Sequence, residues 1–240
     1  MKVSIVVPAF NEERLLADSL HCINLAAGAF QKRGWTSELI VCDNNSTDRT
    51  AEIARAAGAT VVFEPLNQIA RARNRGADAA TGDWLLFVDA DSHPGAELFV
   101  DVADAIESGQ CLAGGATVRL DKNCLIGGLC ILLWNVASRW RRLLAGSFIF
   151  CETATFRKIG GFSRELFAGE ELELSARLWK AAKQSGKRVI ILHRHPLVTS
   201  ARKLELYTFR EHFRLIARLC RNRRVLASRE ACHLWYDGRR

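Results

Sequence analysis

The chain has 240 residues, 49% of them hydrophobic, which allows one large domain or two small ones with a sizeable core. Its eight cysteines form no C-x-x-C pair and several lie in apolar runs, which favours free thiols in a reducing compartment over a disulfide framework or a zinc site. The net charge of +8 is concentrated at one end: from His193 onward there are 12 Lys and Arg against 4 acids, whereas the first 192 residues hold 22 of each. Such an end can contact nucleotide phosphates, an anionic membrane or nucleic acid.

No segment of the sequence predicts a signal peptide or a transmembrane helix. The apolar run Val3–Val7 is short and leads directly into Pro8 and charged residues. The longest charge-free stretch, Asn123–Ser138, is shorter than a bilayer span and contains two adjacent glycines. We therefore expect a cytoplasmic protein.

Strands and helices are expected to alternate in the first part of the chain. Apolar runs predict strands at Val3–Val7, Glu38–Cys42, Thr60–Phe63 and Trp84–Val88. Helical spacing predicts helices after a cap at Asn11, over about Ala51–Ala57 and over about Ala70–Ala80. This alternation is typical of βαβ units around a parallel sheet.

The second part of the chain has a looser pattern. A helix is expected over about Ala96–Ser108, a strand near Leu112–Leu120 and a late strand at Val189–Leu192. Gly169 should precede an amphipathic helix with Leu172, Ala176 and Trp179 on one side. We find no repeat and no Pro-rich linker, so a single domain is expected.

Polar residues follow three of the predicted strands, in the segments Pro8–Glu12, Asp43–Asp48 and Asp89–Asp91. The carboxyl ends of parallel strands share one sheet edge, so these segments should line one crevice. Asp89 and Asp91 turn to the same side of an extended chain, and their oxygens suit Mg²⁺ or Mn²⁺. The alternative interpretation is a turn with two solvated acids.

Five stretches in order resemble the inverting, non-processive members of glycosyltransferase family 2. They cover about residues 1 to 180 and are Val6–Glu13, Asp43–Thr50, Ala70–Ala77, Asp89–Asp91 and Gly169–Leu172. The resemblance implies a GT-A type fold, a Rossmann-like α/β sandwich with a mostly parallel central sheet. It also implies a metal-dependent transfer of sugar from a nucleoside-diphosphate sugar, with UDP favoured, to an acceptor hydroxyl.

The resemblance assigns roles on the donor side. Asp91, with Asp89, matches the metal motif. The implied nucleotide site consists of Pro8, Ala9, Asn11, Glu12, Asp43, Arg71, Arg73 and Asp89, in which Asp43 would accept a hydrogen from the base and the arginines would approach the phosphates. Each residue also has a structural alternative: a helix cap, a turn acid or a solvated helix face.

The resemblance also implies a general base, which inversion by a single displacement requires. The family uses the acid of a Glu-Asp pair that opens a helix. Here the pair is Glu170-Glu171, so a longer side chain occupies the second position; we expect Glu171 to be the base and Glu170 the second candidate. Two acids at this point would also complement the helix dipole. His193 or His195 is a candidate metal ligand, and Arg202 is expected near the diphosphate.

The expected organisation is a transferase domain over residues 1–203 and a basic amphipathic helical extension over residues 204–240. The domain would have a nucleotide-binding half of about 1–92 and an acceptor half of about 93–203. The extension could contact an anionic membrane at its inner surface or pack on the core. A lipid, a sugar or a small molecule would be the acceptor, and no nucleic acid is expected.

Several other functions fit the sequence less well. No G-x-G-x-x-G follows the first strand and no P-loop motif occurs, which argues against a dinucleotide oxidoreductase and a P-loop NTPase. The glycine- and arginine-rich loop of a sugar-phosphate nucleotidyltransferase is missing, as is the Q-x-x-R-W motif of processive synthases. The remaining alternative is a catalytically silent relative that binds a nucleotide sugar or a membrane surface.

Overall fold

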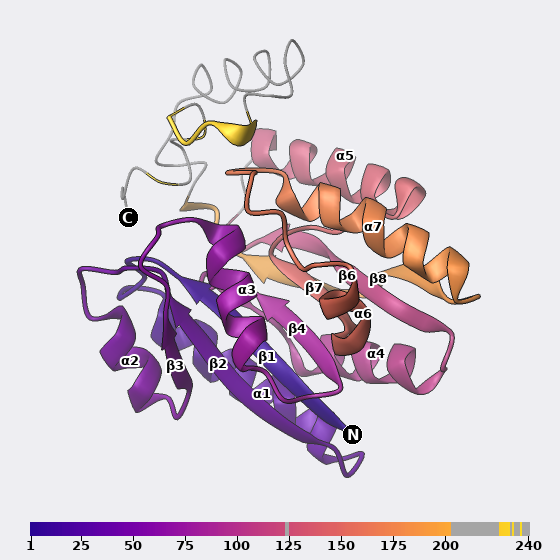
Figure 1. Cartoon of the computed structure of the whole chain (residues 1–240), viewed down its shortest axis with the longest axis horizontal. Helices are drawn as coiled ribbons and strands as arrows, with labels where there is room; N and C mark the ends of the chain where they lie inside the picture. The colour runs from indigo at the N-terminus through magenta and orange to yellow at the C-terminus, as the bar shows by residue number, and fades with distance from the viewer. Residues whose placement is uncertain (123–124, 203–225, 231, 233–235, 237–240) are drawn as a thin grey trace.

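The computed structural model describes residues 1–122, 125–202, 226–230, 232 and 236. Within this part of the chain, eight strands form one sheet in the order β3-β2-β1-β4-β7-β6-β8-β5 (Figure 1). The strands are β1 (Lys2–Ala9), β2 (Thr36–Asp43), β3 (Thr60–Phe63), β4 (Trp84–Val88), β5 (Ser92–His93), β6 (Cys111–Leu120), β7 (Phe148–Glu152) and β8 (Arg188–Thr199). The predicted extension over 204–240 lies largely outside the described residues.

The first four strands are parallel, as their alternation with helices predicts. Strand β4 is buried along its whole length, because helices cover both faces of the sheet. The prediction that Pro8 ends the first strand is wrong, since β1 continues to Ala9. The pairing of β1 with β4 stops at Val6, so Pro8 lies where β1 has a strand neighbour on one side only, and its missing N–H is tolerated.

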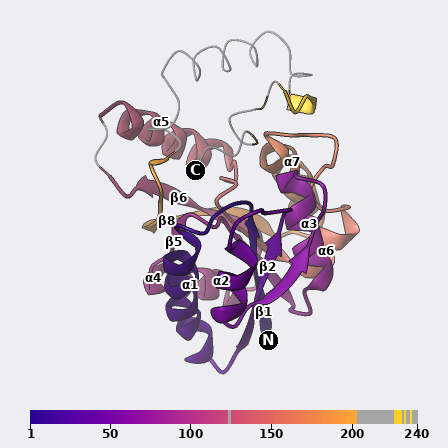
Figure 2. The ribbon, with the colours of Figure 1, turned by 90° about the vertical axis from the view of Figure 1, so that its left-hand side faces the viewer.

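Helices cover both faces of the sheet (Figure 2). The helices are α1 (Leu16–Gln31), α2 (Thr50–Ala56), α3 (Ile69–Ala79), α4 (Ala96–Glu107), α5 (Leu125–Arg141), α6 (Thr153–Lys158) and α7 (Glu170–Gln184). One apolar core packs α1 and α4 against the sheet, and a second core packs α3, α6 and α7 against the opposite face. Helix α3 lies close to β1 because residue 76 is glycine; a Cβ there would clash with the Val6 side chain.

Strand β7 makes the centre of the sheet mixed. It runs antiparallel to both β4 and β6, with Phe148 opposite Val88. This direction brings the residues before β7 to the carboxyl end of β4, where the Asp89 N–H donates to the Ser147 carbonyl (3.2 Å). Residues 146 and 147 therefore join the edge at which the parallel strands end.

Three further local predictions need correction. Asn11 does not cap the first helix, which begins at Leu16; Asn11 has a φ of 52° and its side chain bonds to the loop after β2 instead. On α7 the expected apolar side is exposed, with Leu172 at 38% and Trp179 at 48%, because a different stripe packs on the sheet. The charge-free stretch, for which no element was predicted, contributes to helix α5.

Candidate active site

The loops after β1 and β2 are joined by hydrogen bonds at the carboxyl edge of the sheet. Asn11 donates its N–H to Ser46 Oγ (3.0 Å) and accepts at Oδ1 from the Thr47 N–H (2.8 Å). The Glu12 N–H donates to Thr50 Oγ1 (2.8 Å). These bonds use the polar residues that the sequence assigns to this edge, and they hold the two loops as one surface.

Asp43 and Asn44 end strand β2 and shape the next part of the crevice. Asp43 is buried and accepts at Oδ1 from the Ser46 N–H (3.0 Å), so one oxygen stabilises the turn. Asn44 donates to the Leu66 carbonyl (2.7 Å) and accepts from the Gln68 N–H (2.9 Å). The amide of Asn44 thus fixes the start of helix α3 beside the crevice.

A pocket lies between these loops and the end of β4. It is lined by Pro8, Ala9, Phe10, Glu12, Asn44, Asn67, Ile69, Ala72, Asp89, Ala90, Asp91 and Tyr236. The structure therefore brings both acids after β4 together with Pro8, Ala9 and Glu12, so four of the eight residues expected in the nucleotide site line this pocket. The pocket is small, about 60 Å³, against roughly 300–1,000 Å³ for typical ligand pockets, so its lining has to open before a nucleotide sugar can enter.

Arg202 connects two acids of this pocket. Its guanidinium makes a bidentate ion pair with the Glu12 carboxylate, and both N···O distances are 2.9 Å. The Arg202 Nη2 atom also lies 3.8 Å from Asp91 Oδ2. The main chain beside it is also fixed, because the Ser200 N–H donates to the Asp91 carbonyl (3.1 Å). The predicted diphosphate residue therefore lies beside the predicted metal ligand.

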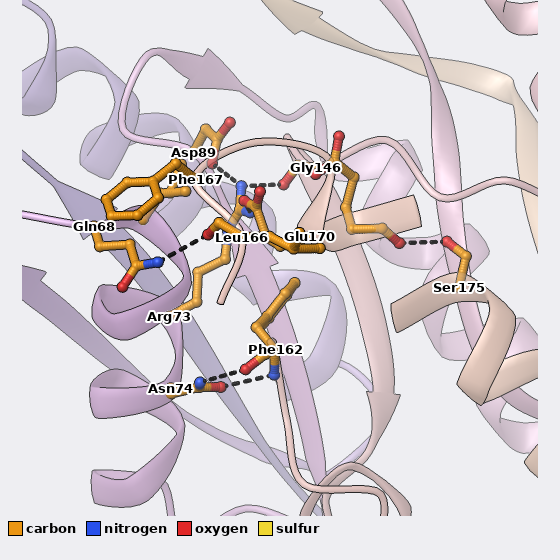
Figure 3. Close-up of polar contacts among 12 residues, drawn as sticks. Gln68, Arg73, Asn74, Asp89, Gly146, Phe162, Leu166, Phe167, Glu170 and Ser175 are labelled. Carbon is orange, nitrogen blue, oxygen red and sulfur yellow. Dashed lines mark hydrogen bonds and ion pairs between the residues drawn. The ribbon is translucent and has the colours of Figure 1, made fainter. Parts of the chain in front are cut away.

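Arg73 on α3 forms the centre of a second ionic cluster (Figure 3). Its side chain is 2% exposed and donates to Glu170 (2.7 Å), Asp89 (2.9 Å) and the Gly146 carbonyl (2.8 Å). Burial lowers the pKa of the guanidinium, but attraction from Asp89, Glu170 and Glu171 outweighs it and raises the pKa overall. Arg73 is thus buried among acids, and its expected direct approach to phosphates does not match this position.

Glu170 and Glu171 begin helix α7 but differ in environment. Glu170 is 3% exposed and paired with Arg73. Glu171 lies next to it, and burial, followed by repulsion from Glu170, raises the pKa of the Glu171 carboxyl to about 8. Glu170 is therefore held by its ion pair with Arg73, and Glu171 has the raised pKa that is typical of a proton-transfer group.

The segment that leads into α7 is held against α3. Asn74 makes two hydrogen bonds to the main chain of Phe162 (2.9 Å each), and Gln68 Nε2 donates to the Arg164 and Leu166 carbonyls (2.9 and 2.8 Å) (Figure 3). The Arg73 guanidinium also lies over the Phe162 ring, with its Cζ 5.2 Å from the ring centroid. These contacts explain why Glu170 and Glu171 meet the end of β4 although about 80 residues separate them in sequence.

Three predicted site residues lie apart from this cluster. Arg71 donates to Gln68 Oε1 (2.9 Å). His195 Nδ1 lies 3.0 Å from Asp101 Oδ2 of helix α4, and His193 lines a hollow beside α5. The register of β8 shifts between Leu192 and Leu197, the stretch that carries both histidines. Neither histidine lines the pocket that contains Asp89 and Asp91, and their assignment as metal ligands stays a prediction.

Sequence reasoning missed two residues of the site. Gly146 has no motif around it, yet a Cβ there would lie 3.1 Å from Arg73 Nη2 and 3.6 Å from Glu171 Cδ, so only glycine fits without a shift. Tyr236 lines the pocket from the far end of the chain, and its hydroxyl donates to the Phe167 carbonyl (2.8 Å). An aromatic pair, Trp235-Tyr236, in a basic segment gave no signal for this position.

Comparison with known proteins identifies relatives of this chain. Residues 4–132 match the family model described as Glycosyl transferase family 2. Glucosyl-3-phosphoglycerate synthase of Mycolicibacterium smegmatis is 38% identical over 97 residues, which are 37% of this chain and 30% of that protein. The first curated relatives are matched over 19%, 32% and 64% of their length, so the chain spans less than two thirds of each.

Solved structures also resemble this fold. A mannosyltransferase from Pyrobaculum calidifontis, in complex with GDP-Man and Mn²⁺, has a TM-score of 0.66 at 19% identity and covers 98% of this chain and 70% of its own. Residues 1–349 of TarS from S. aureus have a TM-score of 0.65 at 21% identity, over 85% of this chain and 61% of theirs. These matches confirm the predicted α/β fold with its mostly parallel sheet.

Proposed function

The chain belongs to glycosyl transferase family 2, and from this premise we propose that it is a metal-dependent enzyme of the GT-A fold that moves a sugar from a nucleoside-diphosphate sugar to an acceptor hydroxyl with inversion. One observation carries the proposal: Arg73 bonds both to Asp89, beside the donor pocket, and to Glu170, next to Glu171. Arg73 thereby holds Asp89, on the donor side, close to the helix end that carries the candidate base Glu171. A single displacement requires donor and base to lie close together.

In the proposed donor complex, the nucleoside occupies the pocket after β1 and β2. Pro8, Ala9 and Glu12 line that pocket and, together with Asn11, would surround the base and ribose. Asp43 would accept a hydrogen bond from the base with the oxygen that its turn does not use. UDP is the favoured nucleotide because a TarS structure contains UDP and another contains UDP-GlcNAc. The Pyrobaculum enzyme contains GDP-Man, which makes a GDP-sugar the second candidate.

The acids after β4 fit Mg²⁺ or Mn²⁺. Among the described residues, no three His, Cys, Asp or Glu side chains gather as metal ligands, so Asp91 and Asp89 would share the cation with the diphosphate and water, the usual arrangement for these ions. A bound cation supplies positive charge to the departing diphosphate. Arg202 pairs with Glu12 in this structure and lies close to Asp91. When the donor is bound, its guanidinium would hydrogen-bond to the phosphate oxygens instead of to Glu12.

Glu171 is the proposed base. Its carboxylate would take the proton from the acceptor hydroxyl as that oxygen attacks the anomeric carbon. Glu170 is the weaker candidate because its ion pair with buried Arg73 occupies its carboxylate and fixes its position. In this arrangement Arg73 positions Asp89 and Glu170 and keeps their charges compensated.

The wider setting is also part of the proposal. Residues 1–92 would bind the donor and 93–203 the acceptor, with 204–240 as an extension. The acceptor would be a hydroxyl of a lipid, a sugar or a small molecule. Among the described residues no helix is both long and apolar enough to span a bilayer. Peripheral contact with an anionic membrane is a further part of the proposal. The free thiols of the described cysteines favour a cytoplasmic setting.

Thermal stability should report donor binding directly. With UDP at about 100 times its Kd and excess Mn²⁺, the melting temperature should rise by roughly 5–10 °C, and EDTA should remove the rise. Asp91→Asn should also remove it, because the amide weakens the cation site that the diphosphate needs. Differential scanning fluorimetry of the full chain, with UDP and GDP compared, measures this.

Asp78→Asn is the matched control, since Asp78 is an exposed acid on α3, and its response should equal that of the parent. A rise that persists in EDTA and in Asp91→Asn would refute the metal role. Slow Mn²⁺-dependent release of UDP from a UDP-sugar would distinguish the enzyme from the silent alternative, which would bind without turnover.

The pH dependence should follow Glu171. Because the folded protein raises the pKa of this acid to about 8, kcat should climb roughly tenfold per pH unit well below 8 and level off above it. The contribution of Glu171 to the free energy of unfolding should change in the opposite sense. It is fully present below the ordinary Glu pKa and is lost as the pH rises through about 8, since the folded state holds a proton that the unfolded state has released. A kcat profile that is flat between pH 5 and 8 would contradict this role.

A further inference from the structure

Five large apolar side chains form one stripe along α5 and face solvent. They are Leu129, Leu132, Leu133, Val136 and Trp140, with exposed fractions from 57% at Leu129 to 79% at Trp140. Their spacing of one, three and four residues puts them all on one side of the helix. A contiguous apolar stripe of this size on a protein surface indicates an interaction site.

Polar groups on the opposite side of α5 hold the helix in place, and those of Asn135 bond to strand β6. Asn135 accepts from the Val118 N–H (3.0 Å) and donates to the Val118 carbonyl (2.9 Å). Ser138 is buried and donates to the Leu143 carbonyl (2.6 Å). Turning the apolar stripe inward would break these bonds, so the fold fixes its outward orientation. Figure 2 shows α5 at one end of the molecule, apart from α1 and α4.

The surface around the stripe is basic. No Asp or Glu occurs between Asp121 and Glu152 in the sequence, whereas Arg139, Arg141 and Arg142 are exposed beside Trp140. The Arg141 guanidinium lies 5.3 Å from the centroid of the Trp140 ring. This end of the helix therefore combines an aromatic ring with three cationic groups.

Helix α7 extends this surface towards the candidate base. Trp140 shares a hollow with Leu172 and Trp179, the exposed residues of α7. Lys183 lies 5.7 Å over the Trp179 ring and adds a further cation. Since Glu171 is the residue before Leu172, the apolar and basic surface adjoins the proposed catalytic end of α7.

We propose that this surface, made of the α5 stripe, its three arginines, Leu172 and Trp179, docks on an anionic lipid bilayer. Exposed Trp rings prefer the membrane interface, and arginines attract anionic head groups. In a symmetric contact with a second copy, both sides would carry the same basic groups, whereas anionic head groups complement them. The purpose of the docking rests on the proposed function, because it would bring a membrane-held acceptor to Glu171; the docking itself does not depend on donor chemistry.

Vesicle flotation of the full chain tests the proposal. The protein should float with vesicles of phosphatidylcholine and phosphatidylglycerol but not with phosphatidylcholine alone, and high salt should weaken the binding. The double variant Leu133→Ser, Trp140→Ser should weaken binding at least about tenfold. Each Arg→Gln change at 139, 141 or 142 should weaken it about fivefold.

Leu25→Ser is the matched control, because Leu25 is 65% exposed but lies on α1, away from the stripe. This variant should bind vesicles like the parent. The proposal is overturned if the parent protein does not float with anionic vesicles, or if the double variant binds them as tightly as the parent. It is also overturned if light scattering shows a dimer that the double variant no longer forms. Nucleotide binding is measured in the same preparations by melting temperature with UDP and Mn²⁺. Flotation without a melting-temperature response to either UDP or GDP would refute the proposed function and support the docking surface, and the reverse result would do the opposite.

Discussion

Replacing Glu171 with Gln should lower kcat by about 10²–10⁴-fold while the affinity for UDP and Mn²⁺ stays the same. Glutamine keeps the size of the side chain but cannot accept the proton of the acceptor hydroxyl, and the loss should match the usual contribution of a general base. Stability should not fall, because the amide replaces a carboxyl whose raised pKa shows that its anion is disfavoured by burial and by Glu170. Initial rates of UDP release with a saturating acceptor measure the change.

Glu173→Gln provides the matched control for this experiment. Glu173 lies in the same first turn of α7, but it is partly exposed and pairs with Arg177 at the surface. Its kcat should remain within about twofold of the parent, since pairs of this kind contribute little. The assignment of Glu171 fails if both variants retain parental kcat, or if the Glu171 variant loses UDP binding together with turnover.

Replacing Arg73 with Met should destabilise the fold by about 3–5 kcal/mol, because two acids would lose their cation inside the protein. Asp89 and Glu170 both bond to this guanidinium, and Glu170 is itself 3% exposed. A domain typically has only about 5–15 kcal/mol of stability, so the variant should unfold at far lower urea concentrations. Urea denaturation followed by circular dichroism measures the loss.

Two further variants separate charge compensation from positioning. Arg75→Met changes an exposed arginine on the same helix and should alter stability by less than about 0.5 kcal/mol. Arg73→Lys keeps the charge but lacks the planar fork that bonds three acceptors at once, so it should recover part of the stability and little of the activity. Parental stability in Arg73→Met would show that the cluster has no structural role.

The local pattern of this sequence was enough to predict the first four strands and the parallel sheet that they form. Apolar runs such as Trp84–Val88 are long enough to be strands, and the helices between them force a parallel sheet whose carboxyl ends meet. Asp89 and Asp91 could be assigned to that edge because a strand carries the residues after it to a defined place. The same reasoning failed for Asn11, where side-chain bonds to the next loop outweighed a helix cap.

Contacts between distant segments decided the rest. Whether Glu170 or Glu171 is tied to a cation depends on Arg73, 97 positions earlier, and Gly146 is required only because two other side chains approach its backbone. The outward side of α5 was likewise fixed by the bonds of Asn135 to β6 rather than by hydrophobic periodicity. Sequence by itself determined the first four strands, the helices between them and the edge at which these strands end, because those follow from neighbours along the chain. The tertiary structure alone decided the charge environment of each acid, because burial and ion pairing depend on residues that meet only after folding.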